Sequence, residues 1–377
     1  MNDKLKNRIL CAGFVLITAG GFLLHLICPD KMLSISERRR LAQAPEVTLT
    51  AVLGGKFATS FDDYALDQFP GRDSFRTLKA IMQYYVFRQK DNNGVFLAEG
   101  NIGKLEFPLS ESSALRAAEK FMSLKAQYFP DSDVYLSLVP DKSYFLAERN
   151  GYPALDYEKM VSLLRENTEG IQYIDLFDTL SADKYYTTDA HWRQECLHDT
   201  ALRLAQGLGV SNSFTWDYEE NRLKDFYGVY YGQAALPFPP DTLVYLTSPT
   251  TEGASVYNAE TQGTTGVYDL AKLTDGKSMD MYDVFLSGAS AVLTVTNPNA
   301  AGEAKGRELI LFRDSFGSSI APLLLDCYET ITLVDIRYIA SAFLGQYVEF
   351  HGQDVLFLYS TSVINNSAML KLSLIHI

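Results

Sequence analysis

An apolar strand breaks into a turn rich in glycine and serine within one short stretch, Leu309-Ile310-Leu311-Phe312-Arg313-Asp314-Ser315-Phe316-Gly317-Ser318-Ser319. The apolar residues predict a buried strand, and the residues after the turn predict the start of a helix. Ser315 would then expose its Oγ at the carboxyl edge of a sheet, where free N–H groups of the helix start face any oxyanion. The other role open to a serine at this place is that of a helix N-cap.

A second stretch places an aspartate two residues before a histidine, in Tyr185-Tyr186-Thr187-Thr188-Asp189-Ala190-His191-Trp192. At that spacing Asp189 and His191 cannot share one face of a helix, but both can reach one site from a loop. Ser, His and Asp are together the parts of an acyl-transfer site, because His takes the proton of Ser and Asp holds the imidazole. A capping Asp189 beside an unrelated His191 is the alternative, and Trp192 either walls the site or packs in the core.

Short apolar segments alternate with helical patterns over most of the chain after residue 90. This alternation predicts an α/β/α sandwich with a mostly parallel sheet. The expected strands are Val134–Val139, Ile171–Asp175, Glu308–Phe312, Thr330–Val334 and Asp354–Tyr359. The expected helices are Ser112–Tyr128, Tyr157–Glu166, Trp192–Leu208, Phe316–Cys327 and Tyr338–Phe350. Residues 212–305 break the rhythm and predict a β-rich insertion, in which Ala291–Thr296 alternates like an antiparallel strand.

The N-terminal segment carries the longest apolar run, Ile9–Cys28, after a short basic stretch. A helix of this length spans roughly 30 Å, the thickness of a bilayer's hydrocarbon. The run is longer than the core of a signal peptide, and no small residues stand before Pro29 for cleavage. We therefore expect a cytoplasmic tail at 1–8, a transmembrane anchor at 9–29, a stalk and helical collar (or a plain connecting segment) at 30–90, and a catalytic domain at 91–377.

The chain of 377 residues has a net charge of −13. Such a charge argues against nucleic acid as a partner, because the phosphates would be repelled. We expect no metal site, since the four cysteines form no C-x-x-C pattern and the spacing of His191, Glu195 and His198 matches no metal-binding motif. Cys196 and Cys327 could form one bridge, although two unpaired cysteines are the favoured interpretation.

Several motifs occur in a fixed order and resemble one protein family. After the single anchor come Ser36-Glu37-Arg38-Arg39-Arg40-Leu41-Ala42 and Phe69-Pro70-Gly71-Arg72-Asp73, followed by the two stretches quoted above. The ordered set, from about Ser36 to about Lys371, resembles the DHHW proteins, which belong with the alginate O-acetyltransferase-like branch of the SGNH hydrolase superfamily. The resemblance implies an SGNH-hydrolase-like fold.

The resemblance also implies a catalytic triad of Ser315, His191 and Asp189, in a chain order that is reversed from ordinary SGNH esterases. Ala190 replaces the first His of the namesake motif, but His191, which the triad needs, is kept. Arg313 stands where a Lys is expected. The candidate substrate-binding or oxyanion residues are Arg313, Gly317, Trp192 and Asn297.

O-acetylation of an extracytoplasmic polysaccharide is the activity that the resemblance implies, with a membrane-bound O-acyltransferase as the partner that brings acetyl across the bilayer. The chain would then need no cofactor of its own. Basic residues stand on both sides of the expected anchor, so the location of the catalytic domain outside the cell membrane rests mainly on the resemblance. Two other functions stay open, namely an esterase with the same triad and a non-catalytic scaffold or glycan-binding protein. The tail Leu372–Ile377 is given no role.

Overall fold

The computed structural model describes residues 3–274 and 279–370. These residues belong to two compact units, a smaller one within Met1–Asn93 and Tyr231–Pro237 and a larger one within Gly94–Tyr230 and Phe238–Ile377. The tail Leu372–Ile377 lies outside the described residues.

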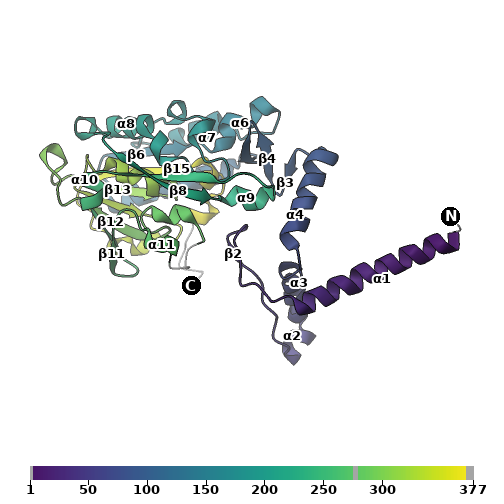
Figure 1. The fold of residues 1–377 in the computed structure, drawn as a ribbon. Helices are drawn as coiled ribbons and strands as arrows, with labels where there is room; N and C mark the ends of the chain where they lie inside the picture. The colour runs from purple at the N-terminus through teal and green to yellow at the C-terminus, as the bar shows by residue number, and fades with distance from the viewer. Residues whose placement is uncertain (1–2, 275–278, 371–377) are drawn as a thin grey trace. The chain divides into compact units, whose positions relative to one another are not determined.

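The smaller unit begins with α1 (Asp3–Ile27), the long purple helix of Figure 1. Among the described residues it is the one helix that is long and apolar enough to cross a membrane. A signal sequence near an N-terminus has the same features, so membrane anchoring stays a prediction. The helix starts at Asp3 rather than Ile9, because lysine and arginine are good helix formers and the basic residues before the apolar run continue it.

The two sequence motifs that follow α1 contact each other in the smaller unit. Arg39 donates to both carboxylate oxygens of Asp67 at 2.8 and 2.5 Å, and Arg72 pairs with Glu37 beside them. Arg39 holds the pKa of Asp67 at about 2, since the two hydrogen bonds favour the charged carboxylate. The elements here are β1 (Leu33–Ser34), β2 (Arg39–Arg40), α2 (Leu49–Leu53), α3 (Lys56–Asp67), α4 (Arg72–Ile81) and β3 (Asp91–Asn92).

A mixed sheet runs through the larger unit, with its strands in the order β11-β10-β12-β14-β13-β15-β6-β7 (Figure 1). The neighbours from β14 to β7 are parallel, whereas β12 joins β14 antiparallel and is followed by β10 and β11. This arrangement confirms the predicted fold class. The strands are β6 (Val134–Val139), β7 (Gln172–Tyr173), β10 (Ser255–Asn258), β11 (Gly263–Thr265), β12 (Val292–Thr296), β13 (Glu308–Arg313), β14 (Thr330–Val334) and β15 (Asp354–Ser360).

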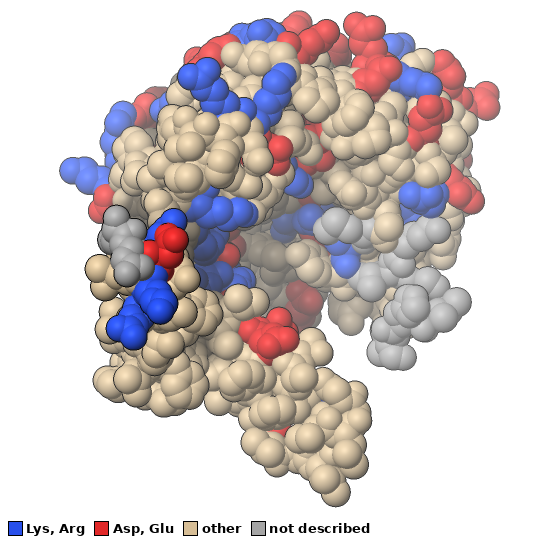
Figure 2. All heavy atoms as spheres, turned by 90° about the vertical axis from the view of Figure 1, so that its right-hand side faces the viewer, with Lys and Arg blue, Asp and Glu red and all other residues tan. Residues whose placement is uncertain are grey.

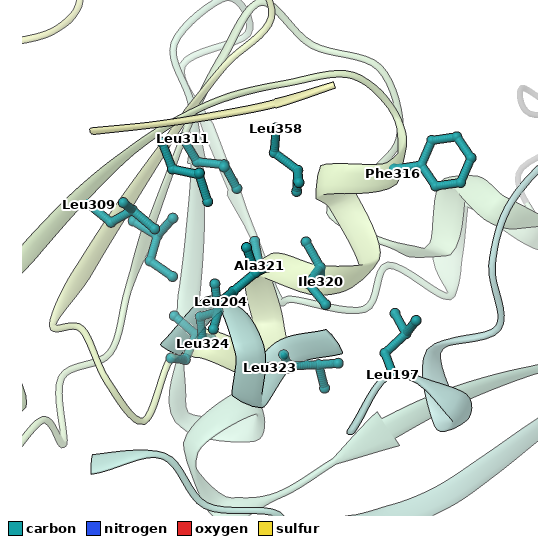
Figure 3. Packing of buried hydrophobic residues seen from close by; sticks show 14 of the residues in the cluster. Leu197, Leu204, Leu309, Leu311, Phe316, Ile320, Ala321, Leu323, Leu324 and Leu358 are labelled. Atoms are coloured by element: carbon teal, nitrogen blue, oxygen red, sulfur yellow. The ribbon is translucent and has the colours of Figure 1, made fainter. Parts of the chain in front are cut away.

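Helices cover both faces of this sheet. Successive strand residues point to opposite sides, and the apolar side chains on both sides need to be covered. Leu309 and Leu311 of β13 pack in one buried cluster, and Ile310 and Phe312 pack in the other. Figure 3 shows the leucines of β13 and β15 facing the helical segment that follows β13. The first face carries α8 (His198–Gly207) and α12 (Phe316–Ile320), and the second carries α5 (Glu111–Tyr128), α7 (Tyr157–Glu166) and α13 (Thr361–Asn365).

Three of the expected helices are shorter than the sequence predicts. The helix expected at Trp192 begins at His198, because Trp192 forms a β-bridge with Tyr185 and a 3₁₀ turn follows. The helix expected after Ser315 changes to a 3₁₀ turn at Ala321, since Pro322 has no N–H for an α-helical hydrogen bond. Residues 338–350 contain only a 3₁₀ helix, Ser341–Gln346.

Residues 212–305 contain two groups of strands. The hairpin of β8 (Glu219–Phe226) and β9 (Asp241–Thr247) stands apart from the main sheet, which β10, β11 and β12 extend. β12 confirms the antiparallel strand expected at Ala291–Thr296. The remaining strands and α-helices among the described residues are β4 (Val95–Ala98), β5 (Asn101–Lys104), α6 (Lys142–Leu146), α9 (Val229–Ala234), α10 (Pro249–Gly253) and α11 (Ala271–Thr274).

Charged side chains of both signs occur on the face drawn in Figure 2. The net charge of −13 therefore does not gather there into one acidic patch among the described residues. Pairs such as Arg203 with Asp178 and Arg149 with Glu99 place opposite charges side by side on the larger unit. Cys196 and Cys327 are both free, which confirms the unpaired interpretation.

Candidate active site

Ser315 and His191 lie in hydrogen-bond contact at the carboxyl end of β13. The distance from His191 Nε2 to Ser315 Oγ is 2.7 Å, and the distance from His191 Nδ1 to Asp189 Oδ1 is 2.5 Å. With the proton on Nδ1, the imidazole donates to Asp189 and its Nε2 accepts from the Ser315 hydroxyl. The expected closeness of Ser315 and His191 at this edge of the sheet is confirmed, and their catalytic role stays a proposal.

Asp314 takes the capping role that Ser315 could have filled. Its Oδ1 accepts from the Phe316 N–H at 3.0 Å, and its Oδ2 accepts from the Ser360 N–H at the end of β15, at 2.8 Å. Ser315 makes no side-chain cap at the start of α12. Ser315 occupies the N-cap position of α12, but its hydroxyl contacts His191 and does not cap the helix.

Asp189 is fully buried, and hydrogen bonds to both oxygens fix the direction of its carboxylate. Oδ1 also accepts from the backbone N–H of His191 at 3.0 Å, and Oδ2 accepts from the Val229 N–H at 2.8 Å. Gly228 passes so close that an added Cβ would lie 2.3 Å from the Asp189 Cβ. The insertion thus supplies backbone that holds the Asp189 carboxylate against the imidazole.

Tyr282, also from the insertion, covers the imidazole of His191. The two rings stack with centroids 3.9 Å apart and an interplanar angle of 11°. The Tyr282 hydroxyl donates to Ser319 Oγ at 2.7 Å, which fixes the ring in this position. Such stacking restricts the rotation of the imidazole about its own bond.

Trp192 does not wall the site. It is fully buried, its Nε1–H donates to Ser319 Oγ at 2.8 Å, and its ring meets Phe316 edge to face. The core interpretation of Trp192 is therefore correct, and its candidate role in binding substrate is wrong, because no part of the ring is exposed.

Arg313 and Gly317 pack against each other beneath the start of α12. The Arg313 side chain is 2% exposed, and an added Cβ at Gly317 would lie 2.5 Å from the Arg313 Cβ. The Gly317 N–H donates to the Asp314 carbonyl at 3.1 Å, so it is already bonded. Neither residue can meet substrate or an oxyanion as the candidate role required, because one is buried and the other has its N–H occupied.

Asn297 lies at the wrong edge of the sheet. β12 runs antiparallel to β14 and places Thr296 opposite Thr330, beside the start of β13 at Glu308. Ser315 follows the other end of β13, roughly 20 Å away at the rise of a strand. The Asn297 amide instead donates to the Leu325 carbonyl at 3.0 Å, so its candidate oxyanion role is wrong.

Two charged residues near the site were not among the sequence candidates. The Lys142 ammonium donates to backbone carbonyls of the turn that carries Asp189, and the Asp241 carboxylate accepts from N–H groups of the same turn. Lys142 comes just after β6, so the strand-end argument that found Ser315 would also have found Lys142. No sequence signal distinguishes Asp241, which starts a hairpin strand. No group of three or more His, Cys, Asp or Glu side chains in residues 3–274 and 279–370 is arranged to hold a metal.

Comparison with known families supports the resemblance seen in the motifs. Residues 155–334, which contain Asp189, His191 and Ser315, match the family model described as DHHW protein. The resemblance to the DHHW proteins is confirmed. No curated protein sequence matches the chain.

Solved structures share the fold. A DHHW family protein from Eubacterium siraeum has a TM-score of 0.57 and 21% identity, over 74% of this chain and 95% of that one. Bacillus cereus PatB1 has a TM-score of 0.55 and 17% identity, over 74% and 99% of the two chains. A structure of PatB1 with a sulfonyl adduct has a TM-score of 0.54 and 17% identity, over 72% and 95%. At these identities the likeness establishes the α/β fold.

Proposed function

We propose that this protein is a membrane-anchored O-acetyltransferase that acts on a cell-envelope or exopolysaccharide glycan through an acyl-enzyme on Ser315. The observation that carries the proposal is the unbroken chain of hydrogen bonds from Asp189 through His191 to Ser315. The three side chains have the order and contacts that nucleophilic acyl transfer requires. The DHHW match over the region that contains them supports the same reaction class.

The reaction has two halves. Ser315 Oγ attacks the acetyl carbonyl of a donor while His191 Nε2 takes the hydroxyl proton, and the imidazolium returns that proton to the leaving group. A glycan hydroxyl then attacks the acetyl-serine, loses its proton to Nε2, and leaves as the acetyl ester while Ser315 Oγ is reprotonated. The first-turn N–H groups of Phe316 and Gly317 are bonded to Asp314, which leaves the Ser315 N–H as the nearest backbone donor for the oxyanion.

The anchor and the partner belong to the same proposal. The length and apolar composition of α1 support a single membrane span. The location of the larger unit outside the cell is proposed from the resemblance to the DHHW proteins. A membrane-bound O-acyltransferase would supply acetyl from within, so this chain would need no cofactor of its own. The acetyl group would reach Ser315 while it is bound either to a carrier molecule or to the partner protein.

The test uses the full chain in detergent with a chromogenic acetyl ester, in the presence and absence of an oligosaccharide acceptor. We expect ester cleavage that speeds up with acceptor, together with acetylated oligosaccharide in the mass spectrum. A sulfonyl fluoride should label Ser315, as mapped by peptide analysis, and Ser315→Ala should abolish both label and turnover. Acetate as the sole product at every acceptor concentration would instead establish an esterase, and an unlabelled Ser315 without turnover would establish a non-catalytic protein.

A further inference from the structure

The amino group of Lys142 is buried against the turn that carries Asp189 and His191. Its side chain is 2% exposed, and its Nζ donates to the carbonyls of Tyr186 at 2.7 Å, Thr187 at 3.0 Å and Asp189 at 3.2 Å. An ammonium group has three hydrogens, so each of them has a carbonyl acceptor.

Asp241 holds the opposite side of the same turn. Its Oδ1 accepts from the Thr187 N–H at 2.9 Å, and its Oδ2 accepts from the Thr188 N–H at 2.8 Å and the Thr188 hydroxyl at 2.6 Å. The turn therefore meets a cation on its carbonyl side and an anion on its N–H side. Hydrogen bonds to charged groups are about twice as strong as neutral ones, so the two contacts fix the backbone firmly.

We propose that Lys142 and Asp241 are positioning residues of the acyl-transfer site, which clamp residues 186–189 so that the Asp189 carboxylate meets His191. The proposal deepens the function proposed above and rests on it for its kinetic consequences. Lys142 does not contact Ser315 or His191, and the Tyr230 ring closes its remaining side at 5.4 Å. It therefore acts through Asp189 rather than on substrate.

Removing the ammonium would leave buried carbonyls without a donor. A buried polar group without its hydrogen bond is unfavourable, so the turn would relax until its carbonyls found other donors. The carbonyl of Asp189 is one of the three, so the relaxation would move the residue whose carboxylate lies 2.5 Å from His191 Nδ1. A displacement of about 1 Å at a catalytic contact can lower a rate about 10²-fold.

The decisive variant is Lys142→Met in the full chain, because methionine keeps most of the length of the side chain and removes the charged donor group. We expect kcat to fall about 10²-fold while KM changes less than about twofold, since substrate binding does not involve the turn. Lys120→Met is the matched control, because Lys120 is a half-buried lysine of α5, a helix that packs on the second face of the sheet. It should keep both constants.

A spectroscopic readout separates positioning from a general loss of structure. The proton between His191 Nδ1 and Asp189 should give a far-downfield ¹H NMR signal in the unmutated protein, because the contact is short and charge-assisted. Lys142→Met should lose or shift this signal upfield while the thermal melt stays cooperative, and Lys120→Met should keep it. A signal and a kcat unchanged in Lys142→Met would overturn the clamp.

A second variant keeps the test valid if Lys142→Met does not fold. Asp241→Asn removes the anion from the other side of the turn and should also weaken the downfield signal, with kcat reduced and KM held. An unchanged signal and kcat in folded Asp241→Asn would overturn the proposal by itself. If the unmutated protein shows no turnover with any acceptor, the proposed function fails, but the presence and loss of the downfield signal still decide the clamp.

Discussion

The ring of Tyr282 lies flat against the imidazole of His191, with centroids 3.9 Å apart, although the two residues are separated by most of the β-rich insertion. Aromatic pairs of this kind are worth about 0.5–1.5 kcal/mol, or roughly 2- to 12-fold in a rate that depends on imidazole orientation. Tyr282→Leu should therefore lower kcat about fivefold on a chromogenic acetyl ester.

Tyr282→Phe is the matched control for this prediction. It keeps the stacked ring and loses only the hydrogen bond to Ser319. We expect Tyr282→Phe to stay within about twofold of the unmutated kcat. Equal losses in both variants would show that the hydroxyl, rather than the stacking, holds His191.

The hydrogen-bonded chain Asp189-His191-Ser315 predicts strongly non-additive losses. Ser315→Ala and His191→Ala should each lower turnover roughly 10⁴- to 10⁶-fold, and the double variant should match the Ser315 variant, because both residues serve one step. Asp189→Ala should lose less, since it acts through His191. Ser318→Ala is the control, because it changes another serine close to Ser315, in α12, and this variant should keep its activity. Losses that multiply in the double variant would mean that the two residues act independently.

The close approach of Gly228 to Asp189 predicts that a larger residue at position 228 would displace Asp189. In Gly228→Ala the added Cβ would lie 2.3 Å from the Asp189 Cβ and 2.4 Å from the Thr188 carbonyl oxygen, so the turn must move. We expect a loss of about 10²-fold in kcat together with a lower melting temperature. Gly266→Ala adds the same methyl group where no atom lies within 4 Å, and should change neither. Normal kinetics in Gly228→Ala would show that the close approach is not needed.

Lys142 predicts an unusual dependence on pH. Burial lowers the pKa of Lys142 to about 7, against the opposing effects of the Asp189 and Asp241 charges, while the buried Tyr230 hydroxyl beside it stays neutral because its own pKa is raised. As the pH rises through about 7 the amine keeps only two hydrogens for three carbonyls, so kcat should fall on the alkaline side. Lys142→Met should have no such fall. An alkaline plateau in the unmutated protein would contradict the prediction.

As the pH rises above about 7, the free energy of unfolding should increase while kcat decreases. The pKa of Lys142 is lower in the folded protein than in the unfolded chain, so the unfolded chain binds more protons between about pH 7 and pH 10. The free energy of unfolding should therefore rise with pH across that window in the unmutated protein. Urea titrations at several pH values should find a smaller rise in Lys142→Met.

Patterns that are local in the sequence determined the outline of this protein. Short, mostly apolar runs placed β6, β13, β14 and β15, because a strand that is covered on both faces is mostly apolar. The same strand-end argument placed Ser315 at the edge where His191 is found. It did so because the carboxyl ends of parallel strands meet at one edge of a sheet.

Contacts between distant segments decided the rest. Whether Ser315 or Asp314 caps α12 depends on the Ser360 N–H of a neighbouring strand, and the burial of Trp192 and Arg313 depends on what packs over them. Asn297 could be placed only once the antiparallel direction of β12 was known. The sequence by itself therefore determined which residues can supply the chemistry, since residue type and strand ends are local properties. Only the tertiary structure decided which of them meet, and that Lys142, Asp241 and Tyr282 hold them, because burial and hydrogen bonding join segments that are far apart in the chain.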